Sequence, residues 1–248
     1  MRRKINPILQ LLVIIYHITI FLPLGILTTI ICCGIVVIQL LIAGNAKWGN
    51  YPAKAWARIL TILSLVRVKV RGTQNIDPNG SYIFVANHQS IYDIPLVYGW
   101  LDNNFKWIMK KELRRLPLIG KTCALMGHIF IDRSNPMRAK QSLEIAKQNL
   151  KQGNLSIFLF PEGTRTRDGQ LLHFKRGAFT IARDIHLPIV PITINGAYDA
   201  LPKGLHYITP GTIEMIIHQP IDTTQLSYEN LNDLIKQVKT TIQTTLKP

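Results

Sequence analysis

A long apolar run without charge opens the chain. Residues 5–46 contain no Lys, Arg, Asp or Glu, and such a run exceeds the roughly 20 residues that one membrane span needs. Pro23 and Gly25 interrupt it, leaving a shorter arm over residues 8–22 and a longer arm over residues 24–43. The pattern predicts an N-terminal membrane-embedded helical hairpin with its turn around the interruption.

Basic residues flank both ends of this apolar run. Residues 2–4 (RRK) precede it, and Lys47, Lys54 and Arg58 follow it. Because basic flanks are retained on the cytoplasmic side, a hairpin with both ends in the cytoplasm is favoured over a single span. A secretory signal peptide is the alternative, but its apolar region is only about 7–15 residues long. We therefore predict a membrane-associated hairpin domain over residues 1–48.

The rest of the chain alternates between strand-like and helix-like patterns. Apolar or alternating runs predict strands within residues 66–72, 81–87, 104–113, 127–133, 155–160, 187–194 and 212–219. Helical spacing and end signals predict helices at residues 56–65, 134–153, 178–185 and 228–246. This alternation predicts an α/β fold, a mixed sheet flanked by helices, as one catalytic domain over residues 49–248.

Charge and cysteine content narrow the class of partner. The 248 residues carry a formal net charge of +15, which attracts nucleic acid, anionic membrane or phosphorylated substrates. No nucleic-acid recognition motif or aromatic–basic platform accompanies that charge, so a nucleic-acid partner is disfavoured. Three cysteines without ligand spacing argue against a disulfide framework or a zinc site. The seven histidines likewise show no mutual metal-ligand spacing.

The stretch FVANHQSIYD, residues 84–93, offers candidate catalytic residues. His88 follows an apolar strand, where α/β folds place their sites, and Asp93 would lie in the first turn of the next helix. The carboxylate could orient the ring and stabilise the imidazolium. The alternative is structural, because Ser90 and Asp93 together form the S-x-x-D pattern of a capping box. Ser90 as a nucleophile is a weaker alternative than Ser90 as a helix cap.

A second candidate region is the loop FPEGTRTRDGQLLHFKRG, residues 160–177. It concentrates the basic side chains Arg165, Arg167, Lys175 and Arg176. Arg133 can converge on the same sheet edge, and arginine binds phosphate oxygens well. Glu162 is placed to orient these cations or a hydroxyl. The alternative is a basic loop that faces solvent or lipid.

Basic pairs and leucines are interleaved between residues 110 and 119. Lys110–Lys111 and Arg114–Arg115 alternate with several leucines and Ile119. Such a mixture is typical of a surface that contacts anionic lipid.

Four short blocks resemble the glycerolipid acyltransferases. NHQSIYD (87–93) is similar to the N-H-x4-D motif of that family, and GHIFIDR (127–133), FPEGTRT (160–166) and VPITI (190–194) follow in the same order. The resemblance covers about residues 66–200. One H-x4-D alone is a weak signal, whereas four ordered blocks are specific.

The resemblance implies a reaction and assigns roles to residues. His88 would be the general base and Asp93 its partner in acylating the sn-2 hydroxyl of lysophosphatidic acid to give phosphatidic acid. The predicted head-group ligands are Arg133, Glu162, Gly163, Thr164 and Arg165, with Pro191 on the acyl-donor side. Lys110, Lys175 and Arg176 are added as substrate-binding residues on charge and position alone.

The same resemblance sets expectations for cofactors and location. The donor would be acyl-CoA or acyl-carrier protein, and the chemistry needs no metal or redox cofactor. The source of the oxyanion donors is left open by the sequence, with backbone N–H groups just after His88 as the one candidate. The protein is predicted at the cytoplasmic face of a bacterial inner membrane, in contact with anionic lipid.

Two other functions remain open at this stage. The first is acylation of glycerol-3-phosphate or of another lysophospholipid. The second, of a different class, is a basic membrane-binding protein without catalytic activity.

Overall fold

The computed structural model describes residues 6–43, 50–132, 134–151 and 155–247. Arg133, the basic flank before the apolar run, and the predicted boundary between residues 48 and 49 all lie outside the described residues.

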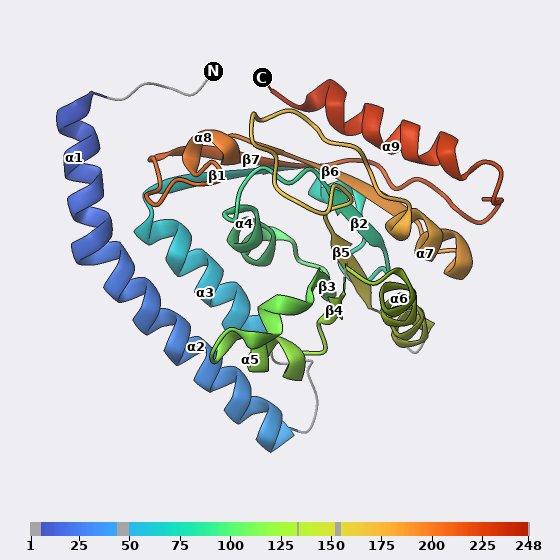
Figure 1. Cartoon of the computed structure of the whole chain (residues 1–248), viewed down its shortest axis with the longest axis horizontal. Helices are drawn as coiled ribbons and strands as arrows, with labels where there is room; N and C mark the ends of the chain where they lie inside the picture. The colour runs from blue at the N-terminus through green and yellow to red at the C-terminus, as the bar shows by residue number, and fades with distance from the viewer. Residues whose placement is uncertain (1–5, 44–49, 133, 152–154, 248) are drawn as a thin grey trace.

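The N-terminal apolar segment forms one long, bent helix (Figure 1). Helix α1, Pro7–Tyr16, continues into a π-helical turn, η1, His17–Phe21, and then into α2, Leu22–Ala43. The predicted hairpin turn around residues 22–25 is therefore wrong. In the described part of the chain, this is the one helix long and apolar enough to cross a membrane.

The π-helical turn explains why Pro23 does not end the helix. Proline normally breaks a helix because it lacks an N–H and its ring meets the carbonyl four residues back. Here the N–H of Leu22 donates to the carbonyl of His17, five residues back. The widened turn takes up the irregularity as a bend, and an apolar segment offers no other partners for its backbone groups.

A helical pair nevertheless exists, between α2 and the next helix. Helix α3, Asn50–Leu63, runs antiparallel to α2 (Figure 1). The indole N–H of Trp56 donates to the Thr29 hydroxyl at 2.9 Å. The Tyr16 hydroxyl donates to the carbonyl of Leu63 at 2.8 Å. The predicted helix at residues 56–65 thus belongs to a longer helix that packs against the N-terminal segment.

His17 joins the N-terminal helix to the rest of the protein. Its side chain is 5% exposed, and its Nδ1–H donates to the carbonyl of Val13 at 2.7 Å. Its Nε2 accepts the backbone N–H of Ile208 at 3.3 Å. Phe21, one helical turn on, packs against the main core cluster.

The predicted mixed sheet is confirmed, with seven strands in the described residues. They are β1 Val66–Arg71, β2 Ile83–Ala86, β3 Phe105–Lys110, β4 Ile129–Ile131, β5 Ser156–Leu159, β6 Ile189–Asn195 and β7 Gly211–Ile217. Their order is β1-β7-β6-β2-β5-β3-β4. Only the β6–β7 pair is antiparallel.

Helices cover both faces of the sheet (Figure 1). The remaining helical segments are α4 Asp93–Trp100, α5 Ile119–Leu125, α6 Pro136–Lys151, α7 Gly177–Ile185, α8 Ala197–Ala200 and α9 Leu231–Thr245, with short 3₁₀ turns at η2 Thr73–Asn75 and η3 Lys111–Arg115. Helices α4 and α8 pack on one face, while α6, α7 and α9 pack on the other. Sequence patterns missed α5 and α8, because both are too short for apolar periodicity to register.

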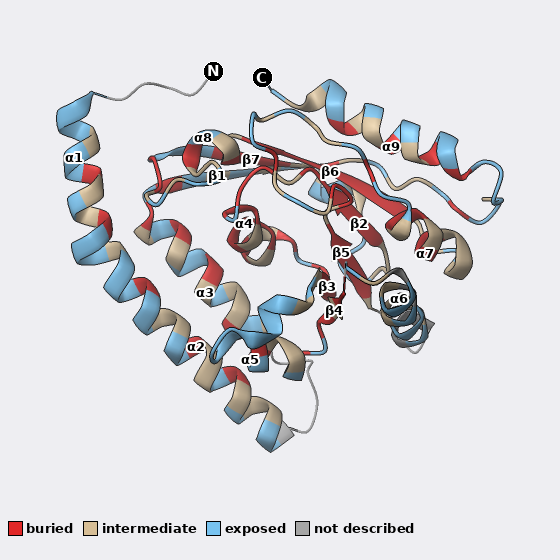
Figure 2. Cartoon of the chain, in the orientation of Figure 1, coloured by how far each residue is buried: buried red, intermediate tan, exposed pale blue. Residues whose placement is uncertain are grey.

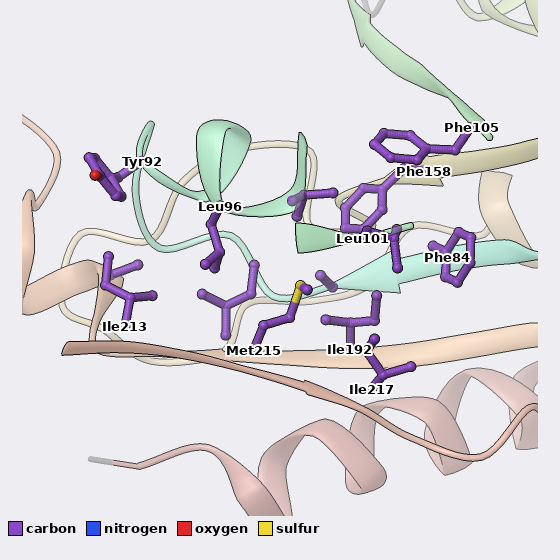
Figure 3. Close-up of a cluster of buried hydrophobic side chains, with 14 of the residues drawn as sticks. Phe84, Tyr92, Leu96, Leu101, Phe105, Phe158, Ile192, Ile213, Met215 and Ile217 are labelled. Atoms are coloured by element: carbon purple, nitrogen blue, oxygen red, sulfur yellow. The ribbon is translucent and has the colours of Figure 1, made fainter. Parts of the chain in front are cut away.

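The strands separate two apolar cores, as alternation along a strand requires. Phe84 of β2 lies in the same cluster as Leu96 of α4 and Ile192 of β6 (Figure 3), whereas Ile83 and Val85 belong to the cluster on the α7–α9 side. All five side chains are fully buried. Figure 2 shows the contrast between these buried strands and the exposed surface of α1 and α2. Each large apolar side chain buried in this way contributes about 1.5–3 kcal/mol.

The sheet topology gathers the chemically interesting residues at one edge. Strands β2, β5, β3 and β4 are parallel neighbours, so their carboxyl ends meet at the same edge. His88 follows β2, Glu162 follows β5, Lys111 follows β3 and Asp132 follows β4. Ligand sites in α/β sheets usually lie at this edge.

Candidate active site

His88 and Asp93 form a hydrogen-bonded pair at the start of α4. His88 Nδ1 lies 2.8 Å from Asp93 Oδ2, and the carboxylate side chain is fully buried. Since a carboxylate only accepts, the ring proton sits on Nδ1. The other ring nitrogen, Nε2, keeps its lone pair and has no hydrogen-bond partner among the described residues. With 16% of the His88 side chain exposed, Nε2 can accept a proton from a substrate.

The same carboxylate oxygen also holds the turn together. Asp93 Oδ2 accepts the backbone N–H groups of Gln89 and Ser90, both at 2.9 Å. These two N–H groups are therefore engaged, and the prediction that they stabilise an oxyanion is wrong. Asp93 is placed by the fold before any substrate arrives.

Ser90 serves the turn and has no nucleophilic geometry. Its hydroxyl accepts the N–H of Tyr92 at 3.0 Å and donates to the carbonyl of Leu201 at 2.7 Å. Ser90 is fully buried. The Tyr92 hydroxyl pairs with Ser64, just beyond the end of α3. Capping and the His88–Asp93 pair are thus parts of one structure rather than alternatives.

The Phe160 ring stacks against the His88 imidazole, a contact that sequence patterns did not indicate. The two rings of His88 and Phe160 are stacked, with centroids 3.9 Å apart and planes 7° from parallel. The stack therefore fixes the plane of the imidazole ring.

Glu162 bridges two loops and does not orient the arginines as expected. One carboxylate oxygen accepts the N–H of His88 at 2.7 Å, and the other accepts the N–H of Leu172 at 2.9 Å. The side chain is 4% exposed. Burial raises the pKa of Glu162 to about 7, and the nearby Asp93 charge adds to this effect against the lowering effect of the two backbone N–H groups. Its role as a substrate ligand stays a prediction that these contacts do not support.

Replacement of Glu162 by glutamine should change how stability depends on pH. The folded protein retains the Glu162 proton up to about pH 7, whereas the unfolded chain releases it near the ordinary pKa of 4.5. Within this window the folded state binds more protons, so rising pH lowers the free energy of unfolding, by on the order of 3 kcal/mol across the window. The uncharged Glu162→Gln variant lacks this contribution. The free energy of unfolding, measured by denaturation at pH values across this window, should fall less steeply with pH for the variant than for the original chain. Equal slopes would contradict the raised pKa of Glu162.

The loop after Glu162 lies directly against the His88 turn. The N–H of Thr166 donates to the carbonyl of His88 at 3.0 Å. Gly163 has a positive φ of 72°, and a Cβ at that position would lie 2.8 Å from Lys175 Nζ. The Lys175 side chain therefore lies over the Gly163 backbone, and the positive φ favours glycine at this position.

Arg165 is a half-buried cation of this loop that has no polar partner in the described structure. Thr164 beside it is exposed. A partly desolvated guanidinium without a carboxylate is suited to bind a phosphate from a ligand.

Other predicted binding residues do not converge on His88. The guanidinium of Arg176 lies 5.4 Å from the ring centroid of Tyr228, and Lys110 pairs with Glu112 at 3.7 Å. Pro191 is a buried residue within β6, paired in register with Val85, so its side chain faces the α7–α9 layer rather than the α4 side. Their roles as substrate ligands stay predictions that these positions do not support.

Asp132 is a charged residue at this edge that sequence reasoning passed over. It pairs with Lys111 at 2.5 Å and accepts the Ser134 hydroxyl at 2.6 Å. The hydrogen bond from Lys111 is the main cause that lowers the pKa of Asp132 to about 2. Its position next to Arg133 in the FIDR block was the available signal.

The described residues contain no group of three or more His, Cys, Asp or Glu side chains that could hold a metal ion. His128, from the GHIFIDR block, belongs to the core instead. Its Nε2 pairs with the Tyr98 hydroxyl, and burial, with a further effect of the Lys106 charge, lowers its pKa to about 3.

Comparison with known proteins gives one consistent result. Residues 67–195 match the model of the Acyltransferase family. A 1-acyl-sn-glycerol-3-phosphate acyltransferase of Limnanthes douglasii is 36% identical over 173 residues, which is 70% of this chain and 61% of that protein. The alpha form of the enzyme from Homo sapiens is 33% identical over 182 residues, or 73% of this chain and 64% of that protein. The chain thus spans somewhat under two thirds of the length of these relatives.

A solved structure is similar over nearly the whole chain. The crystal structure of the 1-acyl-sn-glycerophosphate (LPA) acyltransferase PlsC from Thermotoga maritima superposes with a TM-score of 0.80 at 30% identity. The match covers 95% of this chain and 94% of that one.

Proposed function

Because the chain belongs to the Acyltransferase family, we propose that it acylates the sn-2 hydroxyl of lysophosphatidic acid to form phosphatidic acid. The observation that carries the proposal is the His88 imidazole, with Nδ1 held by a buried carboxylate and Nε2 free. The loop that carries Arg165 lies against the same turn. Relatives of similar sequence bear the name of this activity.

The reaction uses one proton shuttle. His88 Nε2 takes the proton of the acceptor hydroxyl as that oxygen bonds to the thioester carbonyl carbon of acyl-CoA or acyl-carrier protein. Asp93 stabilises the imidazolium. Collapse of the tetrahedral intermediate breaks the C–S bond, and the thiolate leaves with the proton from Nε2. A thiol with a pKa near about 8.5 is a good leaving group and needs little further assistance.

The phosphate of the acceptor selects the substrate in this proposal. Arg165 supplies a fork of N–H donors, and Lys175 supplies a point charge above the Gly163 backbone. Arg133 follows β4 in sequence and stays a candidate third ligand. The proposal needs no metal or redox cofactor for these steps.

Membrane association follows from the lipid nature of the acceptor and product. The Pro7–Ile42 helix is long and apolar enough to contact the bilayer core. The basic residues on both sides of this segment favour the cytoplasmic side. The proposed location is the cytoplasmic face of a bacterial inner membrane.

An acceptor panel with two matched arginine variants tests the function. The Arg165→Ala variant should raise KM for lysophosphatidic acid about 10- to 100-fold, because a charge-assisted contact of about 1.5–3 kcal/mol is lost. KM for the acyl donor should change little. Arg167→Ala is the control, since Arg167 is exposed on the same loop and its side chain makes no hydrogen bond or ion pair in the described structure.

Three outcomes would overturn parts of this proposal. Transfer only to acceptors that lack a terminal phosphate would mean that the substrate is another lysophospholipid. Faster transfer to glycerol-3-phosphate would assign that acceptor instead. No transfer with any acceptor or donor would favour a non-catalytic membrane-binding protein.

A further inference from the structure

An exposed segment emerges from the catalytic edge of the sheet. Residues 112–119, which we call the η3–α5 tip, connect β3 to α5, and all eight of them are exposed. Four are large aliphatic residues, Leu113, Leu116, Leu118 and Ile119, with exposures of 38–44%. Clusters of exposed aliphatic side chains mark sites of contact with a protein or a membrane.

The tip is a defined structure rather than a loose loop. The N–H of Gly120 donates to the carbonyl of Leu116 at 2.9 Å. Gly120 is buried, and a Cβ there would lie 2.3 Å from the carbonyl oxygen of Arg114. Leu118 adopts φ 60° and ψ −58°, a region that costs a residue with a side chain about 1–3 kcal/mol. The fold thus maintains a strained turn that leaves leucines exposed.

Basic side chains surround these leucines. Arg114, Arg115 and Lys121 are all exposed, and the one acidic residue of the tip, Glu112, pairs with Lys110. Aliphatic residues with a basic rim match the interface of a bilayer that contains anionic lipids, where each basic residue contributes about 1 kcal/mol.

The tip also lies beside the N-terminal apolar helix. Helix α5 packs against α2 (Figure 1), and Figure 2 shows that the exposed surfaces of these segments are neighbours. At its other end, Lys111 pairs with Asp132 at the catalytic edge. The tip thus connects the exposed apolar helix with the edge that carries His88.

We propose that the η3–α5 tip is a second membrane-contact site, which binds the anionic lipid surface and holds the catalytic edge against it. The proposal extends the proposed function, because a lipid acceptor must pass from the bilayer to His88. An anionic bilayer is the occupant that both the basic rim and the continuity with α2 favour. A second copy of the chain would satisfy the leucines but not the arginines.

Hydrogen exchange on the full chain tests this site directly. The protein is placed in nanodiscs of phosphatidylcholine alone, or of phosphatidylcholine with phosphatidylglycerol, and the exchange of residues 112–119 is followed. We expect slower exchange of the tip in the anionic nanodiscs, reversed in the Arg114→Gln/Arg115→Gln double variant. Lys69→Gln/Lys236→Gln is the matched control, because both lysines are exposed and lie on β1 and α9.

Activity provides a second and independent readout. On anionic vesicles the double arginine variant should transfer to a long-chain acceptor about 10- to 30-fold more slowly, the equivalent of about 2 kcal/mol. Its rate with a short-chain acceptor dissolved below its micelle concentration should stay unchanged. Equal exchange of the tip in both kinds of nanodisc would overturn the site. Protection that depends on protein concentration and not on lipid would assign the tip to self-association. Loss of activity on the soluble acceptor would instead assign the arginines to the catalytic centre.

Discussion

Replacement of His88 by alanine is expected to abolish acyl transfer and leave the fold intact. The imidazole, held by Asp93 through Nδ1, keeps its other nitrogen, Nε2, as a proton acceptor. General-base catalysis contributes about 10²–10⁴-fold, so the rate at saturating substrate should fall by at least this factor. The turn itself should persist, because the backbone N–H groups of Gln89 and Ser90 still bind Asp93. Release of free thiol from the acyl donor measures the rate.

A second histidine, His173, supplies the control. His173 lies exposed on the loop between β5 and α7, so His173→Ala should retain normal transfer. Circular dichroism and thermal unfolding should be similar for both variants. Substantial residual transfer in a folded His88→Ala variant would remove the general base from the mechanism.

The second large effect is expected from Asp93→Asn. Asp93 Oδ2 accepts three N–H groups, while Oδ1 is buried and has no partner among the described residues. An asparagine can therefore place its oxygen where Oδ2 was and its NH2 where Oδ1 was. The orientation and tautomer of His88 are retained, and only the negative charge is lost. Transfer should fall by about 10²–10³-fold, because the imidazolium loses its counter-charge.

The stability of the variants separates this charge effect from a structural one. The NH2 group buried without an acceptor should reduce the free energy of unfolding by about 1–3 kcal/mol. Asp93→Ala leaves three N–H groups without an acceptor and should destabilise the turn itself. Near-normal transfer in a folded Asp93→Asn enzyme would mean that the charge plays no part in catalysis.

The sequence predicted where the strands lie better than it predicted which strands are neighbours in the sheet. Each strand was visible because local alternation or an apolar run defines it. The pairing of β1 with β7 joins residues 66–71 to residues 211–217, and no local pattern encodes so distant a contact. The N-terminal hairpin was wrong for a related reason, since Pro23 is a breaker in general but here follows a π-helical turn.

The candidate site divides in the same way. The His88–Asp93 contact was predictable because both residues lie in one short turn, where five positions fix their separation. The Phe160 stack and the contacts of Glu162 depend on β2 and β5 being neighbours. The oxyanion prediction failed because it assigned the Gln89 and Ser90 N–H groups to substrate before Asp93 had been placed. Contacts across strands require the assembled sheet.

The contacts of His17 show that the N-terminal helix and the α/β domain are packed together rather than separate. A simple membrane anchor could be replaced without effect on the domain attached to it, because the two would share no buried contacts. Here His17 in the N-terminal helix accepts a backbone N–H from the loop before β7. Phe21 in the same helix packs against the core that α4 covers. The loop before β7 begins near Leu201, whose carbonyl accepts the Ser90 hydroxyl from the His88–Asp93 turn. The N-terminal helix thus shares buried contacts with the α/β domain, and an unrelated helix of equal hydropathy that lacks His17 and Phe21 would not make them.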